Sequence, residues 1–129
     1  MEVAQALAEL VELSSQVERA VVLEADASVL GSTVGDPTEA DALAKAALEL
    51  LDAAVALRSG HAEVTRAEVE LAEGGLFVIR EGGRTIAATT GPRPTAGLVA
   101  YDLRTCLDRV GEAEKPKRRR TARPAKESE

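Results

Sequence analysis

The sequence predicts an α+β domain, a three-layer α/β arrangement with a five-stranded antiparallel sheet in the order α-β-β-α-β-β-β-α. Three observations support this prediction. Apolar residues recur at helical spacing in three segments, short runs of β-branched and aliphatic residues lie between these segments, and turn-forming residues separate the runs. The charged, proline-containing end of the chain has almost no large apolar residue. We therefore expect residues 1–110 to form the folded domain and residues 111–129 to form a disordered basic tail.

Composition limits the classes to which the protein can belong. Its 129 residues with 45% hydrophobic content fit one globular domain, and the 2% aromatic content requires an aliphatic core. A single cysteine excludes an internal disulfide and favours a reducing compartment. No apolar run approaches the roughly 18 residues of a membrane span, and the N-terminus does not resemble a signal peptide. These features predict a soluble cytoplasmic protein.

The first predicted helix covers about Glu2 to Val17, where apolar residues follow a helical period. Two short strands follow, at 20–23 and 28–33, and the turn between them at 24–27 makes them a hairpin.

A long helix is predicted from Pro37 to Arg58. Asp36 can cap it, proline suits its first position, and Glu39 completes a capping-box pattern. Arg58 in the last turn and Gly60 beyond it are typical of a helix end.

The faces of this helix suggest that a second protein chain covers it. One apolar face suits packing on a sheet, and a second apolar row faces elsewhere. A helix that is apolar most of the way round is usually covered on two sides. The alternative is that the second row is simply Ala-rich and tolerated in water, since Ala is the best helix former. The first face consists of Leu43, Ala47, Leu51, Ala54 and Val55, and the second row of Ala46, Leu50, Ala53 and Leu57.

Three strands and a helix are predicted next. Residues 66–71 alternate between polar and apolar, so this strand should have one wet face, whereas 76–79 is apolar on both faces and should be central. A turn with two glycines at 81–84 leads to a closing strand at 85–89. The last helix should begin at about Thr95 and end at Gly111.

This order of elements resembles the Roadblock fold, the dynein-light-chain-type domain that also occurs in bacterial regulators of small Ras-like GTPases. Residues 20–33 resemble its first hairpin, 75–90 its strand pair and 97–103 its last helix. The resemblance covers about residues 2–110 and rests on apolar patterns. One departure is the first turn, where the family commonly has Asp-Gly and this chain has Asp26-Ala27.

The resemblance implies a non-enzymatic homodimeric adaptor that binds a small Ras-like GTPase. In that family two copies join through the third strand, with the long helix near the two-fold axis, which would explain the second apolar row. From the residues we infer that Arg66 of each chain would oppose Glu68 of the other if the third strands pair around Ala67. The expected dimer interface is Ala46, Leu50, Ala53, Leu57, Arg66, Ala67 and Glu68.

No catalytic or metal-binding constellation emerges from the sequence. His61, the sole histidine, is expected to lie in a loop after the long helix, and Cys106 is expected to be a small core residue. Arg84 and Arg93 are expected in exposed turns, where solvation is favoured over a role as an arginine finger. The glycine pairs lack the Lys-Ser/Thr of a phosphate-binding loop. We therefore expect no enzymatic activity, cofactor or metal.

The tail is the one strong electrostatic feature. The net charge of −6 combines −9 up to Arg109 and +3 from Val110 onward. Basic clusters bind nucleic acid or other anionic surfaces in a salt-dependent way. The alternative function is thus a dimerisation platform that presents basic tails to such partners. The charge of the tail is equally compatible with a solubilising role, or with a tail that folds back on the acidic body. The candidate tail contacts are Lys115, Lys117, Arg118, Arg119, Arg120 and Arg123.

Overall fold

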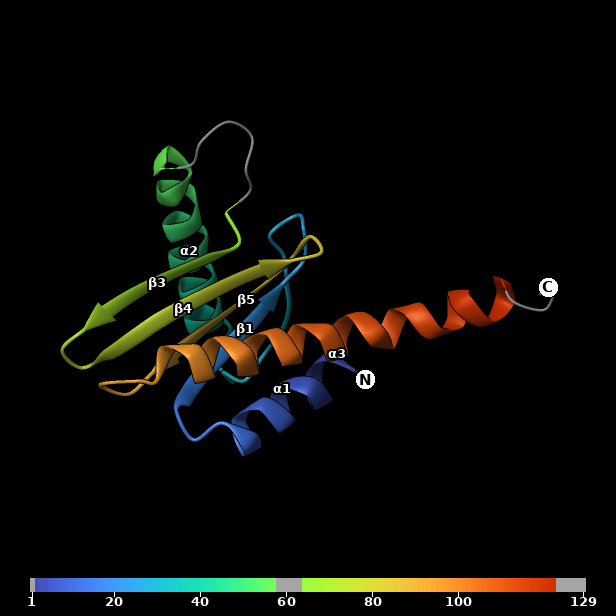
Figure 1. The fold of residues 1–129 in the computed structure, drawn as a ribbon, viewed down its shortest axis with the longest axis horizontal. Helices are drawn as coiled ribbons and strands as arrows, with labels where there is room; N and C mark the ends of the chain where they lie inside the picture. The colour runs from blue at the N-terminus through green and yellow to red at the C-terminus, as the bar shows by residue number, and fades with distance from the viewer. Residues whose placement is uncertain (1, 58–63, 123–129) are drawn as a thin grey trace.

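The computed structural model describes the backbone of residues 2–57 and 64–122 and the side chains of 2–57 and 64–111. Three layers are visible in Figure 1: two helices cover one face of a sheet, and a third helix crosses the other face. The elements are α1 (Val3–Leu13), β1 (Val17–Leu23), β2 (Val29–Ser32), α2 (Pro37–Ala54), the 3-10 turn η1 (Val55–Leu57), β3 (Arg66–Leu71), β4 (Gly74–Glu81), β5 (Arg84–Thr90) and α3 (Ala96–Ala122).

The five strands form one antiparallel sheet in the order β2-β1-β5-β4-β3. The predicted element order and sheet are therefore confirmed. Strands β1 and β5 lie side by side although one precedes α2 and the other follows β4. Strand β3 occupies an edge of the sheet, where its outer backbone groups have no neighbouring strand within the described chain.

Two apolar clusters hold the layers together, one on each face of the sheet. Alternate residues of β1 serve both clusters: Ala20 and Val22 pack toward α1 and α3, whereas Val21 and Leu23 pack toward α2. Successive strand residues point to opposite faces, so a strand covered on both faces needs a continuous apolar run. This explains why the central strands lack a wet face.

Helix α1 is shorter than the sequence predicted. It ends at Leu13, and Val17 is the first residue of β1, where it pairs with Thr90 of β5. The prediction failed because Val17 fits the helical period of α1 and also suits a strand. A hydrogen bond from the Thr95 amide to Gln16 Oε1, 2.5 Å, ties the connection between α1 and β1 to the start of α3.

The turn between β1 and β2 keeps its shape without glycine. The Ala27 amide donates to the Glu24 carbonyl, and the Glu24 amide donates to the Ser28 carbonyl, both at 2.9 Å. Ala27 itself has a φ of 75°, in the left-handed region. This combination is a three-residue hairpin loop in which glycine is the usual residue at the last position. Asp26 strengthens the loop by accepting hydrogen bonds from the amide and hydroxyl of Ser28.

Helix α2 begins as predicted, and its buried stripe shares Ala47 and Leu51 with the predicted face but is rotated from it. Asp36 caps it by accepting from the Thr38 amide at 2.9 Å, and Pro37 is the first residue. The buried residues are Ala40, Ala44, Ala47 and Leu51. The predicted face differs because it included the larger Leu43 and Val55 in place of Ala40 and Ala44. Small residues at 40 and 44 let the helix approach the sheet closely. The helix proper ends at Ala54; the predicted end signals at 58 and 60 lie outside the described residues.

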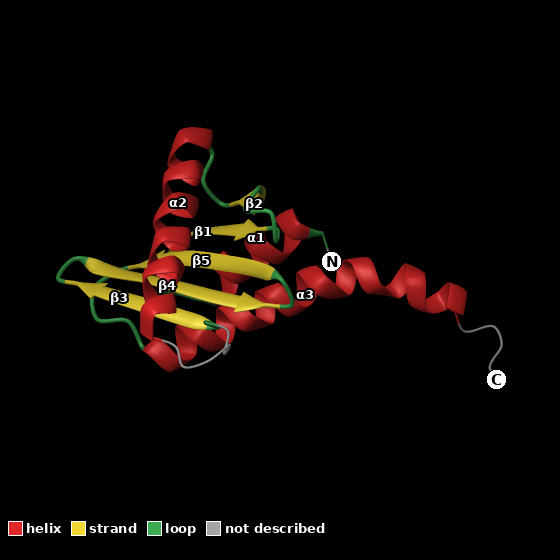
Figure 2. Ribbon diagram, turned by 90° about the horizontal axis from the view of Figure 1, so that it is seen from above, coloured by secondary structure: helices red, strands yellow, loops and turns green. Residues whose placement is uncertain are grey.

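Helix α3 continues through Gly111 to Ala122, so the predicted helix end at Gly111 is wrong. Glycine inside a helix costs only about 1 kcal/mol relative to alanine, which is not enough to force a stop. Part of the segment expected to be a disordered tail is therefore helical backbone, and residues 123–129 lie outside the described residues. Figures 1 and 2 show this part of α3 projecting beyond the sheet.

Candidate functional site: the surface around α2 and β3

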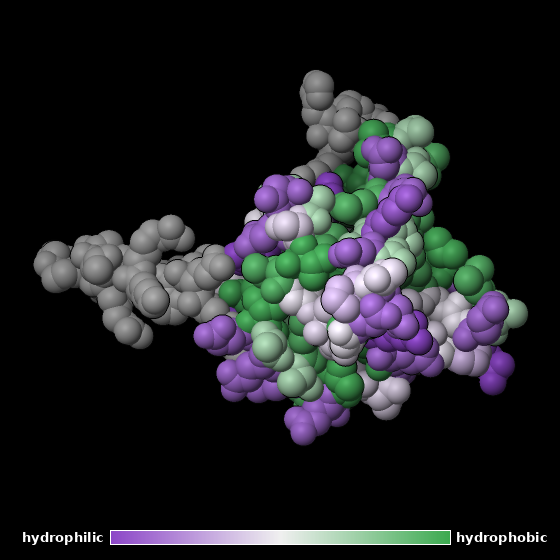
Figure 3. Space-filling model, turned by 180° about the vertical axis from the view of Figure 1, so that it is seen from behind, coloured by the Kyte–Doolittle hydropathy of each residue, from purple (hydrophilic) through white to green (hydrophobic). Residues whose placement is uncertain are grey.

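Helix α2 is the only helix on its face of the sheet within the described chain, and it crosses the strands steeply (Figure 2). One helix cannot cover a five-stranded sheet, so both flanks of α2 leave surface open. Figure 3 looks onto this side of the molecule and shows apolar and charged surface lying next to each other. The two flanks differ in chemistry, as the residues on each of them show.

The apolar flank carries the second row predicted from the sequence. Ala46 and Ala53 are exposed, and Leu57 in η1 is 87% exposed. Leu50 is half-buried because it also packs against the cluster beneath α2. The structure therefore leaves most of this row uncovered in the single chain, with Leu57 as its most exposed large side chain.

The β3 edge carries the other predicted interface residues. Ala67 is half-buried against the α2-side cluster, whereas Arg66 and Glu68 are exposed. Arg66 Nε donates to Glu68 Oε2 of the same strand at 2.6 Å. The cross-chain pair inferred from the sequence would thus compete with a pair already formed within the chain. Leu71 at the end of β3 was not among the predicted interface residues, because its place in the alternating pattern suggests burial, but it is 59% exposed.

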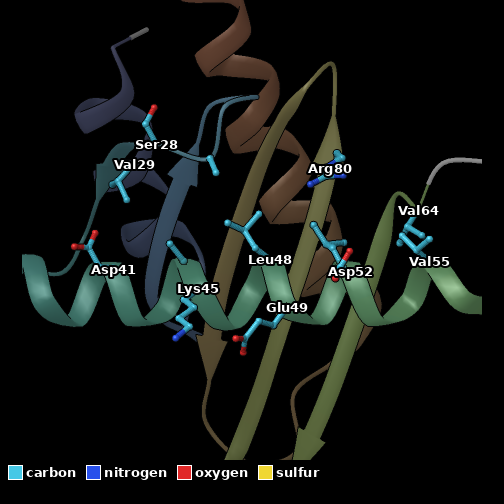
Figure 4. A pocket seen from close by; sticks show the side chains of 13 residues that line it. Ser28, Val29, Asp41, Lys45, Leu48, Glu49, Asp52, Val55, Val64 and Arg80 are labelled. Carbon is cyan, nitrogen blue, oxygen red and sulfur yellow. The ribbon is translucent and has the colours of Figure 1, made fainter.

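The charged flank forms a groove, which sequence analysis also missed. The groove is open to solvent and has a volume of about 800 Å³ between α2, the β1–β2 turn, β4 and the segment before β3. Figure 4 shows Asp41, Leu48 and Asp52 of α2 on one side and Arg80 of β4 across from them. Residues from four parts of the chain line it, so no local sequence signal could have revealed it.

The tips of the β1–β2 and β4–β5 hairpins lie next to each other. Arg84 Nε lies 3.5 Å from Glu24 Oε1, and its side chain is only 17% exposed. The expectation that Arg84 is a solvated turn residue is therefore wrong, since it links the β4–β5 turn to the β1–β2 turn. Arg93 is exposed, as expected, and has a φ of 54°.

The residues with potential chemistry do not form a site with this surface. Cys106 is buried in the cluster beneath α1 and α3, as predicted, and burial raises the pKa of its thiol to about 11. Glu9 adds to this rise and Arg109 opposes it. Among the described residues no group of three or more His, Cys, Asp or Glu is arranged to hold a metal ion. His61 lies outside the described residues.

The predicted tail contacts within the described backbone lie away from α2 and β3. Residues 115–120 are on the projecting part of α3, and Arg123 is outside the described residues. The structure thus separates the two sets of candidate residues within one chain. In the described part of the chain, no helix has the length and hydropathy that a membrane span requires.

Solved structures of similar fold were found, whereas the other comparisons found no match. No protein-family model and no curated protein matches the sequence. A Roadblock/LC7 domain from Streptomyces avermitilis superposes with a TM-score of 0.76 at 24% identity, over 88% of this chain and 98% of that domain. A second Roadblock/LC7 domain structure from the same organism gives 0.65 at 27% identity, over 81% and 94%.

The bacterial protein MglB has a similar structure. MglB of Myxococcus xanthus superposes with a TM-score of 0.68 at 13% identity, over 88% of both chains. The resemblance inferred from the sequence is confirmed at the level of three-dimensional structure, and the chain has the Roadblock/LC7 fold.

Proposed function

We propose that this chain is a non-enzymatic, homodimeric Roadblock-type adaptor that binds and regulates a small Ras-like GTPase. The observation that carries the proposal is the apolar flank of α2 beside the free edge of β3. Both features are unfavourable in an isolated chain and would be satisfied together by a second copy.

Leu57 and the β3 edge would both gain from contact with a second copy. Burial of a leucine side chain contributes about 1.5–3 kcal/mol, and a two-fold interface would bury Leu57 twice. An open strand edge can pair with other chains, and pairing with its own copy blocks such association. Because both features lie on the same side of the molecule, one two-fold contact can cover them.

The resemblance to Roadblock proteins is what supports the proposed GTPase partner. The Roadblock family, which this chain resembles, includes bacterial regulators of small Ras-like GTPases. MglB proteins are among the solved structures of similar fold. In this proposal the adaptor acts by preferring one switch conformation of the GTPase, because a ligand shifts an equilibrium by its difference in affinity for the two states.

Self-association is tested by light scattering on wild type, Leu57→Glu and Leu13→Glu. Both residues are exposed leucines, at 87% and 71%, but Leu13 lies on α1, on the opposite face. In about 1 M salt, which screens association between charged surfaces, we expect wild type and Leu13→Glu to have twice the mass of the chain and Leu57→Glu to be a folded monomer. A monomeric wild type, or a Leu57→Glu protein that stays dimeric, would contradict the proposed interface.

GTPase binding is tested with the small Ras-like GTPases of the encoding organism, each loaded with GDP or with a non-hydrolysable GTP analogue. We expect one of them to bind in a nucleotide-dependent way and to keep its affinity when residues 112–129 are deleted. Failure of all of them to bind, combined with salt-sensitive duplex DNA binding that requires residues 112–129, would instead support the tail-presenting platform.

A further inference from the structure

The groove on the charged flank of α2 is separate from the proposed dimer contact. Helical spacing places Asp41, Leu48 and Asp52 on one side of α2 and Leu50 and Leu57 on the other. A second copy covering Leu57 and β3 would therefore leave the groove open. Its floor is apolar, with Leu48 and the buried Leu51 among the lining residues.

Carboxylates give the groove its charge. Asp41 and Asp52 point into it in Figure 4, and Glu49 lies on its rim. None of the three forms an ion pair with another described residue. Two cations, Lys45 and Arg80, also line the groove, so carboxylates are in excess. A ligand with an excess of positive charge and enough aliphatic surface to cover the floor would suit it.

The end of this chain has that chemistry. Residues 110–129 carry seven basic and four acidic side chains, whereas the preceding residues have a net charge of −9. Lysine and arginine bury their aliphatic stems on apolar surface while the charged ends stay in water. A basic segment can thus cover Leu48 and pair with Asp41 and Asp52 at the same time.

The direction of α3 determines which copy supplies the segment. Figures 1 and 2 both show α3 leaving the body at the end of the sheet where the β1–β2 and β4–β5 turns lie. The groove reaches the first of these turns, because Ala27 and Ser28 of the β1–β2 turn line it. However, α3 continues outward as a helix to Ala122 and so leads away from the groove of its own chain. A second molecule facing this end could receive it.

We infer that the groove beside α2 binds the basic C-terminal segment of another copy of this chain, so that molecules associate end to end through charge complementarity. This contact does not depend on pairing through β3. The two can therefore occur together or fail separately.

The test is sedimentation velocity of the full-length protein over a range of concentrations, in low salt and in about 1 M salt, where the Debye length falls to about 3 Å. We expect the average mass to rise with concentration in low salt only. Asp41→Arg/Asp52→Arg should raise the dissociation constant of this association roughly tenfold or more, since it replaces attraction by repulsion. The matched control Glu12→Arg/Asp108→Arg makes the same charge change at exposed positions on α1 and α3 and should retain association.

A charge swap makes the test specific. Arg118→Glu/Arg120→Glu should abolish association on its own, and mixing it with Asp41→Arg/Asp52→Arg should restore association, because each partner then offers the other a complementary groove and tail. A mass that does not depend on concentration in low salt would overturn the inference. Docking of the tail on the groove of its own chain would give this result. Equal loss in the control, or no recovery on mixing, would also overturn it. The Leu57→Glu variant should keep the salt-sensitive association, which separates this result from that of the proposed dimer.

Discussion

Replacing Ala27 by glycine should stabilise the protein, although the substitution lies on the surface and removes a methyl group. Ala27 is exposed and closes the β1–β2 loop with a φ of 75°. A left-handed conformation costs an L-residue about 1–2 kcal/mol, because Cβ approaches the following carbonyl oxygen. Glycine does not incur this cost.

The expected gain is reduced by the unfolded state. Glycine loses more backbone freedom on folding than alanine, at a cost of about 0.5–1 kcal/mol. The difference leaves a net stabilisation of at most about 1.5 kcal/mol for Ala27→Gly, or up to roughly 6 °C in Tm for a domain of this size. Ala25 lies in the same loop, is also exposed and has no positive φ. Ala25→Gly should therefore destabilise by the same glycine penalty of about 0.5–1 kcal/mol.

The assay is urea denaturation of both variants and wild type, followed by circular dichroism at one fixed protein concentration, because self-association would make stability depend on concentration. The two substitutions should shift the midpoint in opposite directions with unchanged slopes. If Ala27→Gly destabilises as much as Ala25→Gly, the left-handed conformation of Ala27 is not a source of strain and the reasoning fails.

Two further predictions concern a close contact and a buried thiol. A Cβ at Gly74 would lie 2.1 Å from the Thr90 carbonyl oxygen, so Gly74→Ala should destabilise the fold by more than about 2 kcal/mol in the same denaturation assay. The control Gly97→Ala, on an open side of α3, should instead stabilise it by up to about 1 kcal/mol. Equal effects of the two substitutions would contradict the close contact between Gly74 and Thr90. The Cys106 thiol has its pKa raised from 9.0 to about 11, so its thiolate fraction at pH 8 is about a hundredfold lower than that of an unperturbed thiol, and Ellman's reagent should react rapidly only after unfolding. The raised pKa stabilises the fold below pH 9, and this contribution should decline as the pH rises toward 11; rapid labelling of the native protein would refute the burial of Cys106.

Sequence patterns predicted the features that depend on neighbouring residues. The prediction that Asp36 caps α2 was correct because the capping hydrogen bond joins residues only two positions apart. The prediction that Cys106 lies in the core was correct because its neighbours at helical spacing share one apolar face. The rotation of α2 was missed because alanine fits buried and exposed positions equally well, so Ala40 and Ala44 gave no signal. The groove was missed for a different reason, since it depends on where the β1–β2 turn and β4 come to lie in the folded sheet.

The pairing of β1 with β5 at the middle of the sheet has a consequence for how the protein is made. Val21 pairs with Ala87, 66 residues later in the chain. A ribosome must therefore release almost the whole domain before the sheet can close, and contacts between distant segments slow the search for the native state. The β1–β2 hairpin and α2 leave the ribosome before β5, so their apolar faces stay exposed to solvent until β5 has been synthesised. Such exposure favours misassembly and chaperone binding. We therefore expect nascent chains that stop before residue 84 to remain unfolded and protease-sensitive, with the native sheet forming only once β5 has been synthesised.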